Sequence, residues 1–227
     1  MIYAFKKGNK VQTLDEHIEK CLNVLDKIRN SKLWSSVFNY EFVKRTIVFH
    51  DIGKVFYQKN KKNLSFVGHE FISAYVFWKV FGDCFIGDEK KLELLYLFPI
   101  IFHHHTMRIK GGGSRKGRLE ALESISITSP TEEVLFELKK ILMKYISYEY
   151  VKKTVKALIH LEILEVKNKI ESKINDIWRE FHGRFARNCL RLLLITMTCD
   201  YEGSKSRGKP TSFGRILEEF LEYYGSR

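Results

Sequence analysis

Apolar residues recur at every third or fourth position along most of the chain, which is the spacing of an amphipathic α-helix. The first such stretch follows the sequence TLDE at residues 13–16, which matches the capping box that opens many helices. Its apolar face comprises Leu14, Ile18, Cys21, Leu22, Leu25 and Ile28. Because the alternation typical of β-strands is nearly absent, the pattern predicts an all-α protein.

The same spacing predicts a series of further helices. They span about residues 40–56, 69–80, 88–107, 149–165, 168–200 and 212–224, and another follows SPTE at residues 129–132, which matches a second capping box. Pro99 is expected to kink the helix that contains it. A chain of 227 residues that is 44% hydrophobic can bury one substantial core, so we expect a single domain over residues 1–227.

The charge is strongly basic, with 39 Lys and Arg against 27 Asp and Glu and a net charge of +12. Such an excess favours a polyanionic partner, although a lysine-rich surface that only aids solubility is the alternative. Two glycine- and serine-containing basic stretches, residues 108–118 and 203–210, are predicted to contact nucleic acid, unless they are solvated linkers. The residues predicted to make these contacts are Arg115, Lys116, Arg118, Lys205 and Arg207.

The cysteines and the hydrophobic runs bear on the compartment. Cys21, Cys84, Cys189 and Cys199 stand singly in apolar stretches, so we expect reduced, buried thiols and no zinc-thiolate site. The N-terminal sequence lacks a signal-peptide core, and no run of 18 uncharged apolar residues occurs. A cytoplasmic, soluble protein with no membrane partner is therefore expected.

Several histidines fall on inward-facing stripes of different predicted helices. They are His17, His50, His69 and the consecutive His103, His104 and His105. A single histidine on an apolar face is usually a hydrogen-bonded core residue, but here that reading has to apply to each helix independently. Facing helices of a bundle commonly build metal sites from such side chains, so we expect the imidazoles to converge on metal. His160 and His182 are expected to be structural or exposed.

The sequence VFHDIGKVF at residues 48–56 places His50 and Asp51 side by side in an apolar run. An unpaired carboxylate is costly there, and a metal pair would supply the compensating charge. Gly53 leaves room beside the site, and Lys54 is placed to neutralise charge on a phosphate, although a surface lysine is the alternative. For Glu70, a solvated residue in the first turn of a helix is favoured over a metal ligand.

Taken in chain order, these residues resemble the motif of the HD superfamily of metal-dependent phosphohydrolases. The motif positions are His17, the His50-Asp51 doublet, His69, the tandem histidines at 103–105 and Asp200. Within the superfamily, the sequences HDIGK, GHE and CDYEGS and the tandem histidines resemble the stand-alone HD nuclease of type I CRISPR interference. The resemblance spans residues 17–204, which is nearly the whole chain.

The resemblance implies an HD-type helical bundle with a two-metal site in its core. One metal would be held by His17, His50, Asp51 and Asp200, and the other by Asp51, His69, His103 and His104. A slip of one residue to His104 and His105 stays open. Lys54 and Ser204 match positions near the scissile phosphate, which assigns them, with Asp51, a catalytic role.

The implied activity is hydrolysis of phosphodiester bonds in single-stranded DNA, or RNA, during CRISPR antiviral defence, as an endonuclease or exonuclease. The two divalent ions would be Mn, Mg, Fe, Co or Ni. Because the chain stops at residue 227, a separate helicase subunit and an RNA-guided effector complex are expected to deliver the strand to a monomeric nuclease. The alternatives are a nucleotide phosphohydrolase of the same superfamily and a non-catalytic helical module that binds nucleic acid or protein.

Overall fold

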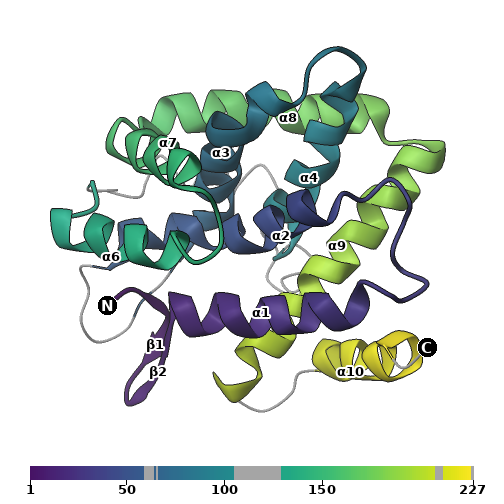
Figure 1. Ribbon diagram of the computed structural model, residues 1–227, viewed down its shortest axis with the longest axis horizontal. Helices are drawn as coiled ribbons and strands as arrows, with labels where there is room; N and C mark the ends of the chain where they lie inside the picture. The colour runs from purple at the N-terminus through teal and green to yellow at the C-terminus, as the bar shows by residue number, and fades with distance from the viewer. Residues whose placement is uncertain (59–63, 65, 105–128, 208–211, 226–227) are drawn as a thin grey trace.

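The fold is largely helical, as the apolar spacing predicted (Figure 1). The computed structural model describes residues 1–58, 64, 66–104, 129–207 and 212–225. Its α-helices are α1 (Leu14–Ile28), α2 (Tyr40–Phe49), α3 (His69–Phe81), α4 (Lys90–Phe102), α6 (Glu132–Leu142), α7 (Tyr148–Ile159), α8 (Ile163–Glu180), α9 (Gly183–Ser204) and α10 (Ser212–Gly225). Short 3-10 helices are η1 (Ile52–Tyr57), η2 (Gly82–Cys84), η3 (Gly87–Glu89) and η5 (Lys205–Arg207).

The chain opens with a β-hairpin that the sequence reasoning missed. Strands β1 (Tyr3–Lys7) and β2 (Lys10–Thr13) pair antiparallel and project beside the start of α1 (Figure 1). The predicted capping box follows directly, since the Thr13 hydroxyl accepts from Glu16 N–H and the Glu16 carboxylate accepts from Thr13 N–H. The hairpin was overlooked because its strands of 5 and 4 residues are too short to show a clear alternation.

The helix predicted over residues 40–56 is interrupted at the His50-Asp51 doublet. Helix α2 ends at Phe49, and the chain continues through a turn into η1. Gly53 fixes this path, because its N–H donates to the Ser73 hydroxyl at 2.9 Å and a Cβ at this position would overlap the backbone of His69. The doublet therefore lies at a junction between helices, and the expectation that both residues project from one regular helix is wrong.

The long helix predicted over residues 168–200 is likewise two helices. Helix α8 ends at Glu180 and α9 begins at Gly183, whose φ of 53° is in the left-handed region that favours glycine. The apolar stripe continues through both helices, with Ile177 and Cys189 both buried, which is why the break is not visible in the pattern.

Two other boundaries also shift. The N-cap of α6 is Thr131, whose hydroxyl accepts from Val134 N–H at 3.3 Å, so the capping box predicted to begin at Ser129 is wrong. Helix α4 runs through Pro99 and ends at Phe102, five residues before the predicted limit of 107. Residues 105–107 of the predicted helix lie outside the described part of the chain.

Helices far apart in the sequence form the core. Helix α9 packs against both α1 and α4, and α3 packs against α4, α7 and α8. Aromatic side chains fill the space between α2 and α3, where the Phe49 ring lies 5.9 Å from that of Phe77 and 5.1 Å from that of Phe81. Within the described ranges, no helix combines the length and the apolar character needed to cross a membrane.

We expect Phe49→Ala to lower the free energy of unfolding by about 3–5 kcal/mol, because it removes a fully buried ring and leaves a cavity. Urea denaturation followed by circular dichroism measures the change. The matched control is Phe136→Ala, which truncates a ring that is 59% exposed and should change stability by less than about 0.5 kcal/mol. Equal effects of the two variants would contradict this description of the core.

Candidate metal centre

The predicted metal ligands converge from five separate segments. His17 lies in α1, the His50-Asp51 doublet follows α2, His69 begins α3, His103 and His104 follow α4, and Asp200 lies near the end of α9. Helix ends supply most of these positions, so one site collects side chains from elements that start or stop around it. All seven residues are buried except His104, which is half-buried.

The first group of donor atoms consists of His17, His50, Asp51 and Asp200. His17 Nε2 lies 3.2 Å from Asp51 Oδ2, 3.2 Å from Asp200 Oδ1 and 3.4 Å from His50 Nε2. His50 Nε2 lies 3.6 Å and 3.7 Å from the same two carboxylate oxygens. Ligands about 2.0–2.2 Å from one ion are roughly 3.0–3.5 Å from one another, so the group has the size of a metal cage.

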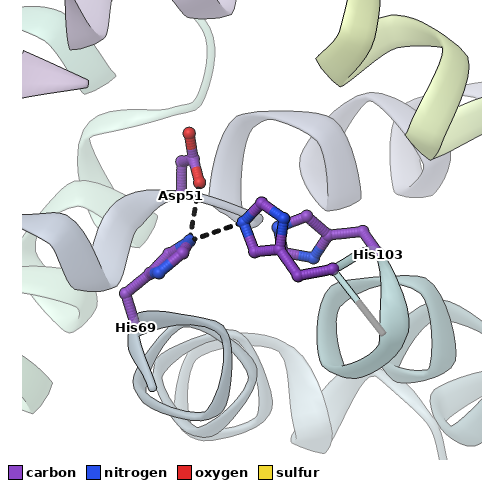
Figure 2. Close-up of side chains that lie close together, drawn as sticks. Asp51, His69 and His103 are labelled. Carbon is purple, nitrogen blue, oxygen red and sulfur yellow. Dashed lines mark hydrogen bonds and ion pairs between the residues drawn. The ribbon is translucent and has the colours of Figure 1, made fainter. Parts of the chain in front are cut away.

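The second group comprises Asp51, His69, His103 and His104 (Figure 2). His69 Nε2 lies 3.0 Å from Asp51 Oδ1 and 3.2 Å from His104 Nε2. Asp51 thus presents Oδ2 to the first group and Oδ1 to the second. Both His103 and His104 belong to the group, whereas His105 lies outside the described residues, so the alternative pairing with His105 is not tested.

Backbone carbonyl groups set the orientation of the imidazole rings. In three of them Nδ1 donates to the carbonyl three residues earlier: His50 to Ile47 at 2.6 Å, His103 to Ile100 at 2.8 Å, and His69 to Phe66. A carbonyl oxygen can only accept, so in an uncharged ring the proton is on Nδ1 and the lone pair is on Nε2. Metal-binding histidines are typically held in this way, with Nε2 directed at the ion.

This arrangement brings acceptors face to face. The Nε2 lone pair of His69 faces a carboxylate oxygen of Asp51, and among the described atoms His103 Nε2 is buried without a hydrogen-bond partner. A cation placed between these atoms would satisfy them. Burial lowers the pKa of His103 to about 3, and burial followed by the proximity of His103 lowers the pKa of His104 well below its usual range. His103 and His104 are therefore neutral near pH 7, and the donor set fits divalent metal ions.

The two carboxylates are ionised despite their position. Burial alone would raise the pKa of Asp51, but the Lys54 ammonium and the surrounding histidines hold it well below its usual range. For Asp200, burial alone would raise the pKa, but the adjacent imidazoles of His17 and His50 hold it well below the usual range. Ionised carboxylates together with imidazole lone pairs are the form of these side chains that binds metal.

Lys54 is a buried member of the site, so the alternative of a surface lysine is wrong. Its side chain is 5% exposed, and Nζ donates to Asp51 Oδ2 at 2.5 Å. Ser204, the other predicted catalytic residue, is half-buried and its hydroxyl donates to the Tyr201 carbonyl at 2.9 Å. Its role near a phosphate stays a prediction.

Glu70 differs from the expectation of a solvated residue, because its side chain is fully buried. One carboxylate oxygen lies 3.5 Å from His69 Nδ1, on the opposite side of that ring from Nε2. The Glu70 carboxylate therefore lies next to the Nδ1 side of His69, a candidate metal ligand. Its position next to His69 in the sequence was the available signal, and the burial of the first turn of α3 was not apparent from it.

Cys21 also lies next to the first group, as one of the four cysteines that are free thiols. Cys21, Cys189 and Cys199 are buried as predicted, whereas Cys84 is only half-buried. The Cys21 sulfur is 3.7 Å from Nε2 and 4.0 Å from Nδ1 of His17, and Cys21 forms a further candidate donor group with His17 and His50. Cys21 packs against this histidine, and burial raises its thiol pKa well above the usual range.

Of the five residues predicted to contact nucleic acid, the structure describes only Lys205 and Arg207. Arg115, Lys116 and Arg118 lie outside the described residues. Lys205 is paired with Glu202 at 3.4 Å and Glu218 at 2.7 Å, and Arg207 is half-buried and donates through Nε to the Gln12 side chain. His160 and His182 are exposed, as expected for residues outside the site.

Comparison of the chain with protein-family models, with curated proteins and with solved structures gives no match. The resemblance to the HD superfamily therefore stays a prediction from the order of the motif residues in the sequence.

We expect the chain to bind two divalent ions, and Asp51→Asn to weaken binding of both, because this carboxylate is the only one shared by the two groups. Elemental analysis after loading with Mn²⁺ and desalting measures the stoichiometry. His182→Ala, which alters an exposed histidine, is the control and should keep both ions. Full metal content in the Asp51→Asn variant, with unchanged circular dichroism, would contradict the assignment.

Proposed function

We propose that the chain is a metal-dependent nuclease of the HD type that hydrolyses phosphodiester bonds of single-stranded DNA or RNA. The observation that carries this proposal is Asp51, whose two oxygens face two separate groups of histidine rings. Paired metal sites of this kind are typical of enzymes that catalyse in-line displacement at phosphorus. The net charge of +12 supports a polyanionic substrate.

Divalent ions held by the two groups would supply Lewis-acid charge and acidify a water molecule for attack on phosphorus. The chain's own contribution is position. Carbonyl groups hold three of the rings in the donor orientation, and Lys54 holds Asp51. Lys54 Nζ has three N–H donors, so one can stay on Asp51 while another donates to a phosphate oxygen as charge develops there. Its burial makes that contact stronger than it would be in water.

Hydrolysis of free nucleotides is the second candidate, and burial of the centre favours it. Of the seven residues in the two donor groups, only His104 is half-buried, and Asp200 and His69 are 4% and 3% exposed. Such burial suits a small substrate better than a long polymer. The order of the motifs supports the nuclease, because the tandem histidines and the lone His69 complete a second metal group next to the His50-Asp51 doublet.

We further propose that the nuclease acts in CRISPR antiviral defence, with a separate helicase and an RNA-guided complex that present the single strand. The support for this step is the motif order alone.

We expect the Mn²⁺-loaded protein to cleave a labelled single-stranded oligonucleotide faster than it hydrolyses free nucleotides, and a chelator to abolish both activities. Lys54→Met should lower kcat by about 100-fold, since it removes a buried charge that would contact the phosphate. His160→Ala is the control and should stay within a few-fold of wild type. Cleavage that persists in the chelator would refute a metal-dependent mechanism, and a preference for nucleotides would favour the second candidate.

A further inference from the structure

Hydrogen bonds attach the β-hairpin to two segments that border the metal centre, η1 and the end of α9. On one side, the Gln58 side chain accepts from Tyr3 N–H at 2.9 Å and donates to the Tyr3 carbonyl at 3.1 Å and the Lys54 carbonyl at 2.8 Å. On the other side, the Gln12 amide donates to the Gly203 carbonyl at 2.6 Å. In Figure 1 the hairpin projects below α1, on the same side as the end of α9.

The two residues to which the hairpin is attached, Lys54 and Gly203, each contact a residue of the metal centre. Lys54 donates to Asp51, and Gly203 packs directly on His17, because an added Cβ at Gly203 would come within 3.0 Å of the His17 ring. The base of the hairpin therefore borders the centre. A ligand bound at the base of the hairpin would therefore lie beside residues that contact the donor groups.

The hairpin carries charge of one sign only. Residues 1–13 contain Lys6, Lys7 and Lys10 and no Asp or Glu. Lys7 and Lys10 are direct cross-strand partners, and both are exposed. Like charges directly opposite each other destabilise an antiparallel pair, so the hairpin has a charge pattern that an anion would relieve.

Arg207 adds a fourth cation at the base of the hairpin. Its Nε donates to the Gln12 side chain, and its guanidinium lies 5.6 Å from the centre of the Phe5 ring. Gln12 is neutral and 3% exposed, and its amide is fixed because its nitrogen is used on Gly203. Among the described residues, Arg207 and the three lysines form no ion pair with a carboxylate, in contrast to Lys205, which is paired with two. Arg207 Nη2 is buried, and within the described ranges it has no hydrogen-bond partner.

We infer that the hairpin and Arg207 form a phosphate-binding seat, along which a single strand of nucleic acid lies as it enters or leaves the metal centre. The seat consists of Lys7, Lys10 and Arg207, because Lys7 lies on the same face of β1 as Phe5, which Arg207 covers, whereas Lys6 lies on the other face. Its length suits a chain of phosphates better than a single one, because the charges continue from the base of the hairpin to its turn. This inference rests on the proposed nuclease function and adds the surface that holds the substrate.

The test is binding of a labelled single-stranded DNA oligonucleotide, by fluorescence anisotropy in the presence of a chelator and across a salt series. Arg207→Gln should weaken binding about 10-fold and flatten the log-log salt slope by about 0.7, the value for one phosphate contact on a single strand. The Lys7→Gln, Lys10→Gln double variant should flatten the slope by up to about 1.4. Arg207→Lys, which keeps the charge, should restore most of the slope.

The matched control is Arg187→Gln, which removes one charge from an exposed position of α9 and should have a much smaller effect. Thermal melting of each variant shows whether it is folded, and the Lys7 and Lys10 positions keep the test decisive if Arg207→Gln does not fold. Effects no larger than that of Arg187→Gln, or a wild-type chain that does not bind the oligonucleotide, would overturn the seat. Hydrolysis of bis(p-nitrophenyl) phosphate by the metal-loaded protein then decides the proposed chemistry independently, because this small diester does not need the hairpin.

Discussion

The fold is organised around a carboxylate in a place where a carboxylate is costly. Asp51 is fully buried, and its two oxygens contact His17, His69 and the Lys54 ammonium. An isolated charge in such surroundings would be expensive, so the neighbouring groups have to arrive at fixed positions for the core to be stable. The ends of α2, α3, α4 and α9 meet at this point, and each of them contributes a member of the two donor groups around Asp51 and Asp200.

Close backbone approach is the second constraint. Gly53 and Gly203 both stand where a side chain would strike a histidine that belongs to the centre, His69 in one case and His17 in the other. Both glycines have ordinary backbone angles, so they are needed for space and not for conformation. The buried carboxylates attract the histidine side chains, and the two glycines, which have no side chain, allow the backbone to approach these histidines closely.

The sequence predicted the helical class, the capping box at Thr13 and the burial of His17, His50, His69 and His103, because these depend on local spacing. It did not predict features set by distant contacts. The end of α2 at Phe49 depends on Gly53 and on Ser73, which lies in another helix. The break before Gly183 is hidden because the apolar stripe continues across it, and the burial of Glu70 depends on packing of the whole first turn of α3. The lysine pairing of the hairpin appears only once the register of its strands is known.

The pairing of α1 with α9 has a consequence for how the protein is made. Gln12 and Gly203, which touch in the native state, are 191 positions apart, and His17 and Asp200 are separated by nearly as much. Contacts of such high contact order form slowly, since a long loop must close before they stabilise anything. On the ribosome, the N-terminal histidine therefore leaves the exit tunnel long before its carboxylate partner has been synthesised. The complete set of ligands first exists only after Asp200 has been translated, so a product that stops before this residue would carry the doublet but lack a complete first donor group.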